Sequence, residues 1–207
     1  MPSILPRQSS WNTNWQHCKY YKTIFRNPYT VYLLKFAGIF SLCYFTTLGI
    51  IGLASPGGYY SPFIARYADY VTWLRNSLLN ATSGILSVFH IQTEREPGFY
   101  LGMPGGNGVI IAYDCVGYGV YSFWIAFVAA NTGTVWRKIK WIAGGLLLLW
   151  IINVIRITLV LLAINKGWAM PFGIDHHTWF NIAAYILIFI LIFLYDRTGK
   201  RKFKKTG

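Results

Sequence analysis

Four long apolar runs constrain the fold of this chain more than any other feature. They cover residues 31–54, 116–131 with an apolar lead-in from Val109, 141–164 and 178–195. About 20 consecutive apolar residues are enough for a helix to cross the hydrocarbon core of a bilayer. The runs therefore predict an all-α polytopic membrane protein with four to six transmembrane or re-entrant helices. The mean hydropathy of +0.40 agrees with that class.

The positive charges lie between the apolar runs, which sets the expected orientation. Lysine and arginine gather at 7–26 before the first run, at 137–140 between the second and third, and at 197–205 after the last. Cytosolic segments of membrane proteins carry such an excess of basic residues. The first run is therefore expected to lead out of the cytosol. The net charge of +13 therefore indicates contact of the basic clusters with the surface of the lipid bilayer, and not binding to a nucleic acid.

The chain is expected to form a single integral membrane domain, 1–207. Within it we predict a cytosolic N-terminal segment, 1–28, and an extracytoplasmic part, 59–114. The helices that carry the candidate site follow at 115–195, and a basic cytosolic tail occupies 196–207.

The extracytoplasmic part is expected to contain helices and a hairpin. Residues 62–90 are long enough for a helix but too polar for an ordinary span, so we expect amphipathic helices lying on or dipping into the outer leaflet. The alternative is a fifth span with a shifted N-terminus. Two β-like runs at 99–103 and 109–113 flank a Pro-Gly-Gly-Asn-Gly turn. This pattern predicts a small β-hairpin that leads directly to Cys115.

Three chemically distinct kinds of side chain are expected at similar depth on the outer side. Cys115 stands where an outer loop enters the second run, and Arg156 lies in the outer half of the third. His176 and His177 stand at the outer start of the fourth run. Because these residues are far apart in sequence, their convergence is the main indication of a functional site.

The residue types in this group are typical of cysteine–histidine catalysis. Asp114 is a plausible N-cap that would place Cys115 in the first turn of a helix, where the macrodipole stabilises a thiolate. His177 or His176 could take the thiol proton and later protonate a leaving amine. The alternative is an inert thiol and two polar groups at the membrane interface.

Arg156 is a charged residue within a long apolar run, and such a position requires an explanation. An arginine at the centre of a transmembrane helix costs about 2.5–3.5 kcal/mol on insertion scales and normally faces a partner or a water-filled cavity. It can stabilise a thiolate or an oxyanion but cannot act as a base, because it stays protonated. Asn153 shares its helix face at i, i+3 and is expected to orient the guanidinium. In the alternative, Asn153 makes an interhelical hydrogen bond and Arg156 pairs with Asp114 or Asp175.

No metal and no other cofactor is expected. Asp175, His176 and His177 are consecutive, so on a helix they would point in different directions, and the chain has no His-Glu-x-x-His pair. The glycine-rich turn lacks the Lys-Ser/Thr ending of a phosphate-binding loop. The three cysteines are too few and too scattered for a disulfide framework.

The order of these motifs resembles the exosortase/archaeosortase family, in a short variant. Cys-x-Gly at 115–117 opens one span, Asn-x-x-Arg-Ile at 153–157 lies late in the next, and a histidine opens the last, so that the resemblance covers 109–195. Members of this family are regarded as membrane cysteine transpeptidases. The resemblance implies partners that are secreted proteins with a short C-terminal signal, a hydrophobic helix and a basic tail. It implies cleavage near that signal and transfer to a surface acceptor.

The resemblance also implies roles for the matching residues. Cys115 would be the nucleophile, Arg156 the stabiliser of a thiolate or oxyanion, and His177 the acid/base, with His176 as the alternative. The serine that usually follows the cysteine in the family is replaced by valine here, while Gly117 is retained.

We therefore predict a cysteine peptidase or transpeptidase at the extracytoplasmic face of the plasma (inner) membrane. The alternative is a non-enzymatic membrane subunit for export or assembly of a surface polysaccharide, in which Arg156 only holds helices together. A small-molecule transporter is disfavoured, because the charged residues gather at one face rather than along a path. The sorting motif and the acyl acceptor, water or an amine, stay open.

Overall fold

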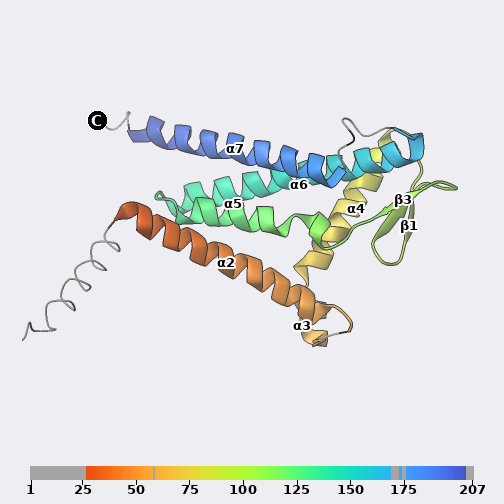
Figure 1. The fold of residues 1–207 in the computed structure, drawn as a ribbon, viewed down its shortest axis with the longest axis horizontal. Coiled ribbons are helices and arrows are strands. Elements are labelled where there is room, and N and C mark those ends of the chain that lie inside the picture. Colours follow the sequence, from red (N-terminus) through yellow and green to blue (C-terminus); the bar gives the residue numbers. More distant parts are fainter. Residues whose placement is uncertain (1–26, 58, 169–172, 174–175, 204–207) are drawn as a thin grey trace, which may run out of the picture.

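The computed structural model describes residues 27–57, 59–168, 173 and 176–203, which form a helical bundle with a small sheet at one end (Figure 1). The bundle contains α2 (Pro28–Ala54), α5 (Tyr118–Ala130), α6 (Val135–Lys166) and α7 (His176–Phe203). Consecutive members contact each other, α2 with α5, α5 with α6 and α6 with α7. Helices α2 and α6 run in one direction and α5 and α7 in the other, as the expected orientation requires.

Three helices in the described part are long and apolar enough to cross a membrane. They cover Pro28–Ala54, Val135–Lys166 and Asn181–Thr198, which confirms the first, third and fourth predicted runs. The second run becomes α5, whose 13 residues extend about 20 Å and fall short of the hydrocarbon thickness. The predicted run is shortened because Gly117 takes a left-handed conformation with φ of 81° just before α5 begins.

The long helices begin and end at residues suited to those positions. The side chain of Asn27 accepts a hydrogen bond of 3.0 Å from the backbone N–H of Tyr29, and Pro28 is the first residue of α2. Helix α6 ends at Gly167, whose φ of 64° allows its N–H to reach the carbonyl of Ala163.

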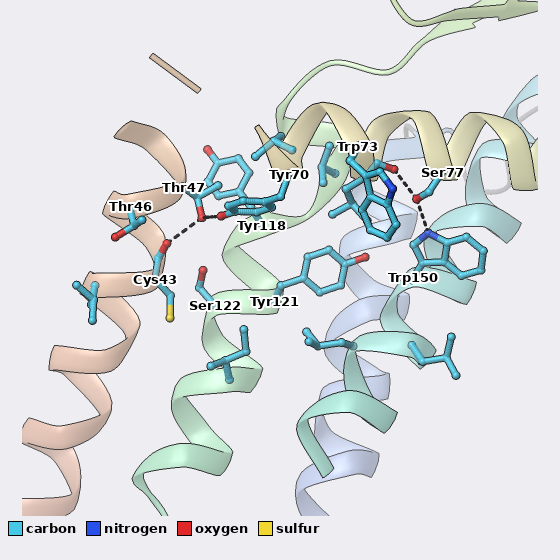
Figure 2. Close-up of a pocket in the computed structure, with 17 residues that line it drawn as sticks. Cys43, Thr46, Thr47, Tyr70, Trp73, Ser77, Tyr118, Tyr121, Ser122 and Trp150 are labelled. Carbon is cyan, nitrogen blue, oxygen red and sulfur yellow. Dashed lines mark hydrogen bonds between the residues drawn. The ribbon is translucent and has the colours of Figure 1, made fainter. Parts of the chain in front are cut away.

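Two further helices cover the end of the bundle at which α2 ends, within the 62–90 segment for which helices were predicted. They are α3 (Pro62–Tyr67) and α4 (Tyr70–Val88), and Asp69 caps α4 by accepting a 2.9 Å hydrogen bond from the N–H of Thr72. Figure 2 shows α4 crossing above the ends of the other helices. One face of α4 is buried at helical spacing, with Val71, Arg75, Leu78, Leu79, Thr82 and Leu86.

A three-stranded antiparallel sheet in the order β1–β2–β3 contains the predicted hairpin. Strands β2 (Tyr100–Gly102) and β3 (Gly108–Ile110) form the hairpin, with Tyr100 opposite Ile110. Strand β1 (Glu94–Glu96) pairs with the other edge of β2 and was not predicted, because its three exposed polar residues show no alternation. The hairpin turn is held against the end of α6, since the side chain of Asn165 exchanges two hydrogen bonds with the backbone of Asn107, at 2.8 and 2.9 Å.

The apolar core has two parts. One part joins α4, the sheet and α6, and the other joins α5, α6 and α7. The first contains Val71, Leu78, Leu79, Leu86, Leu101, Ile111, Val116, Val154, Ile157 and Leu161. The second contains Trp124, Val128, Leu149, Ile188, Leu191 and Tyr195.

Candidate active site

Cys115 lies in a short connection between the sheet and the bundle. It is the middle residue of the 3-10 helix η1 (Asp114–Val116), and its N–H donates to the carbonyl of Ala112 at 3.1 Å. The expectation that Asp114 caps the following helix is wrong, because Asp114 is the first residue of η1 and Gly117 is the N-cap of α5. Cys115 therefore precedes the first turn of α5, in a tight turn with a free, half-buried thiol.

Asn153 and Arg156 on α6 both contact this turn, as their i, i+3 spacing predicts. The buried amide of Asn153 donates to the carbonyls of Cys115 at 2.9 Å and Val116 at 3.1 Å. Its side-chain oxygen accepts from Nη1 of Arg156 at 3.4 Å. Asn153 thus holds the cysteine turn and the guanidinium at once, which combines the orienting role and the interhelical hydrogen bond considered for it.

The guanidinium of Arg156 reaches both the backbone and the sulfur of the cysteine. Nη1 donates to the carbonyl of Cys115 at 3.3 Å, and Nη2 lies 3.7 Å from Sγ of the same residue. An arginine at this distance can make a charge-assisted contact with a sulfur that carries negative charge during a reaction. The same donors can serve an oxyanion that forms on a carbonyl attacked by that sulfur.

A polar cavity of about 300 Å³ adjoins this pair and brings α7 to the site. Arg156 and Asp114 line it together with Asn181, which is in the second turn of α7. Oδ1 of Asp114 accepts a hydrogen bond of 3.4 Å from the hydroxyl of Tyr118. The remaining lining residues are Tyr44, Gly117, Gly119 and Val120. The three helices that carry the candidate site thus meet around one polar space.

The predicted acid/base lies at the edge of the described structure. Helix α7 begins at His176, but the side chains of His176 and His177 are outside the described residues, as is Asp175. The choice between the two histidines therefore stays a prediction. Among the residues that the structure does describe, no three His, Cys, Asp or Glu side chains are grouped closely enough to hold a metal ion.

Figure 2 shows a larger apolar cavity, of about 990 Å³, between the helices. It is covered by α4 and enclosed by α2, α5 and α6, and Val116 forms part of its wall. Hydrogen bonds fix its rim, since Nε1 of Trp150 donates to Oγ of Ser77 at 3.0 Å and the hydroxyls of Thr47 and Tyr70 pair with each other. The exposed side chains of Leu42 and Leu147 stand at its mouth between α2 and α6.

One residue near the site was missed by the sequence analysis. Arg75 lies on the buried face of α4, with 5% of its surface exposed, and bonds the backbone of the chain that leads to Cys115. The signal was present, because an arginine stands there at helical spacing among Val71, Leu78 and Leu79. In the sequence, this arginine contributes to the polarity on which amphipathic helices are predicted for 62–90.

The fold and the site together define a polytopic membrane protein in which a free thiol meets an intramembrane arginine at one end of a helical bundle. The sequence model of the transmembrane exosortase family matches residues 29–194, which is most of the chain, and the chain therefore belongs to that family. The match extends well beyond the 109–195 region on which the resemblance was recognised, and includes α2 to α4. No curated protein and no solved structure matches the chain.

Proposed function

We propose that the protein is a membrane cysteine peptidase or transpeptidase that cleaves the C-terminal sorting signal of secreted proteins and transfers them to a surface acceptor. The observation that carries the proposal is the contact of Arg156 with both the carbonyl and the sulfur of Cys115. A permanent charge within a transmembrane helix, directed at a free thiol, fits an activated nucleophile better than a structural ion pair.

The chemistry proceeds through a thioester. The sulfur of Cys115 attacks the scissile carbonyl while a histidine accepts its proton, and the guanidinium of Arg156 donates to the oxyanion that forms. The carbon–nitrogen bond then breaks, and the histidine returns the proton to the leaving amine. An amine or water then attacks the thioester and gives its proton to the same histidine. The carbon–sulfur bond breaks, and the histidine passes this proton to the departing sulfur, which regenerates the thiol.

His177 is the preferred acid/base in this scheme. Positions 177 and 181 are four residues apart in α7 and therefore lie on the same face of that helix. Asn181 lines the polar cavity that Arg156 also lines. His176 is the alternative. Single alanine variants of the two histidines distinguish them, because only replacement of the acid/base should stop substrate processing.

The distribution of charge supports an active site on the extracytoplasmic side of the plasma membrane. The basic cluster at the start of α6 meets the end of α7, where Nη2 of Arg137 donates to the carbonyl of Tyr195 at 2.7 Å. This basic end lies opposite to the sheet and the cysteine turn (Figure 1). By the positive-inside rule the basic end is cytosolic, which leaves Cys115 outside.

The apolar cavity supports a substrate with a hydrophobic segment next to the cleaved bond. Its wall includes Val116, the residue after the nucleophile, and its mouth opens between exposed apolar residues of α2 and α6. A membrane-embedded segment of the substrate can therefore reach the thiol sideways, from the hydrocarbon, while the signal stays at the polar cavity.

The test is co-expression with a secreted protein of the same host that ends in a short motif, a hydrophobic segment and a basic tail. Wild type should shorten this protein, and Cys115→Ala should leave it at full length while accumulating to the same level. Cys18→Ser is the matched control for loss of a thiol. A wild-type thioester with the substrate, trapped at low pH and absent in Cys115→Ala, gives direct support.

The same experiment distinguishes the proposed enzyme from the non-enzymatic alternative, a membrane subunit for export or assembly of a surface polysaccharide. A scaffold tolerates Cys115→Ser, since the hydroxyl occupies nearly the same space as the thiol. If Cys115→Ser processes the substrate as well as wild type does, covalent catalysis by this residue is ruled out.

A further inference from the structure

Arg75 is a buried cation that the catalytic scheme above does not use. Its side chain is 5% exposed and stands on the apolar face of α4. Burying a charge is costly unless hydrogen bonds and nearby groups compensate it. The burial of Arg75 must therefore be explained by the groups that its guanidinium contacts.

The hydrogen bonds and ring contacts described for this guanidinium are with the chain that leads to Cys115. Nε donates to the carbonyl of Ile111 at 2.8 Å, and Nη2 donates to the same oxygen. The guanidinium carbon lies 3.5 Å from the ring centre of Phe99 and 4.3 Å from that of Tyr113, so it is held between two aromatic faces. Phe99, whose ring makes one of these contacts, adopts a φ of 65°, which bulky residues rarely do.

The segment from Ile111 to Cys115 is consequently fixed at both ends. Arg75 binds the carbonyl at its start, and Asn153 binds the carbonyl at its end. Between them, the hydroxyl of Tyr113 pairs with Oγ of Ser55 at 3.0 Å, which ties the segment to the end of α2. Helix α4 also contacts η1 directly.

The electrostatic setting of Arg75 includes the thiol. Burial lowers the pKa of Arg75, while Tyr113, Asp69 and Cys115 act in the opposite direction. The guanidinium lies over the ring of Tyr113, two residues before Cys115, so its positive charge is held beside the segment that carries the thiol. Other charged or titratable groups on the elements around the cysteine turn include Arg156, Asp114, Tyr44, Tyr118, Tyr113 and Tyr121.

We propose that Arg75 is a positioning residue that keeps a second positive charge close to Cys115 and so favours its thiolate form. Arg156 and Arg75 approach the cysteine turn from α6 and α4, and the thiol lies in a field set by both. The inference rests on the proposed function only in taking Cys115 as the nucleophile.

The test measures the thiolate itself and needs no substrate. Purified full-length protein in detergent is alkylated with iodoacetamide across a range of pH, and modification of Cys115 is followed by peptide mass spectrometry, because only the thiolate reacts. In Arg75→Gln we expect the profile to move to higher pH, with alkylation at pH 7 about tenfold slower. Arg66→Gln is the matched control, since Arg66 is exposed and only stacks on Tyr67.

A purely structural Arg75 gives a different result. If Arg75→Gln keeps the wild-type melting temperature and the wild-type alkylation profile, the proposal is wrong. If Arg75→Gln does not fold, Arg75→Lys tests the proposal instead. Lysine keeps the positive charge but has no guanidinium fork for the Ile111 carbonyl. The proposal requires the lysine variant to keep a profile close to wild type, and a shift as large as that expected for glutamine would overturn it. Either result leaves the substrate-processing test of Cys115 unaffected.

Discussion

Arg156 and Cys115 are 41 residues apart in the chain, yet Nη2 of the arginine lies 3.7 Å from Sγ of the cysteine. Their helices meet through Asn153, which bonds the backbone of the cysteine turn and the guanidinium together. The arginine is therefore oriented by its own helix toward a residue that enters from another element. This relationship explains a charge inside an apolar run and leads to the first two predictions.

Replacing Arg156 should slow processing strongly without removing the protein from the membrane. Glutamine removes the positive charge, and lysine cannot contact the carbonyl and the sulfur at the same time. By analogy with the loss of one oxyanion donor, we expect substrate processing to slow by about 10²–10³-fold. The measurement is the rate of substrate shortening, normalised to protein level. Arg137→Lys, at the other end of the same helix, should process normally, and a fast Arg156→Gln enzyme would refute the assigned role.

Asn153→Ala should lower stability as well as activity. The change removes the amide from the carbonyls of Cys115 and Val116, and the Cys115 carbonyl keeps its longer contact with Arg156. For the Val116 carbonyl we expect a cost of about 1–3 kcal/mol, the range for an unsatisfied buried group. Thermal unfolding in detergent measures the loss. Asn131→Ala is the control, because the amide of Asn131 donates to the carbonyl of Phe127 at the far end of α5, away from the cysteine turn. An unchanged melting temperature for Asn153→Ala would contradict the role of this residue in holding the turn.

Two neighbouring glycines of α6 should respond oppositely to alanine. A Cβ at Gly145 would lie 2.0 Å from Nε1 of Trp124, whereas a Cβ at Gly144 meets nothing within 4 Å. The indole of Trp124 is fully buried and donates to the carbonyl of Trp141 at 3.0 Å, so it cannot move away easily. We expect Gly145→Ala to cost about 1–3 kcal/mol through overpacking.

Gly144→Ala is the built-in control for this pair. Alanine is favoured over glycine in a helix by up to about 1 kcal/mol, so this variant should be neutral or slightly stabilised. Melting temperatures of both variants in the same detergent decide the matter. Equal effects at the two positions would show that α5 and α6 do not pack as described.

The hairpin should loosen when Asn165 is replaced. Asn165→Ala removes both hydrogen bonds to the backbone of Asn107, and we expect amide exchange in the 103–110 turn to speed up about tenfold. Hydrogen exchange read by mass spectrometry provides the measurement. Lys166→Ala is the neighbouring control, since Lys166 lies over the ring of Trp168 and not against the hairpin. Unchanged exchange in Asn165→Ala would mean that the strands alone hold the turn.

The sequence predicted those parts of the fold that depend on local pattern. The long apolar runs predicted three helices able to span a membrane, and the glycine-rich turn predicted the β2–β3 hairpin. The prediction of helix bounds failed where a single residue interrupts an apolar run. Gly117 divides the second run into η1 and a short helix, and nothing in the hydropathy of that run shows the break.

For the site, the sequence by itself determined the residue types and the shared helix face of Asn153 and Arg156, because helical periodicity is a local property. Their depth in the membrane stays a prediction from the charge pattern. Only the tertiary structure decided that Arg156 contacts Cys115 and that Arg75 binds the segment before it. Such contacts depend on how each helix is rotated about its axis and where it crosses its neighbours, and side-chain packing between distant elements sets both.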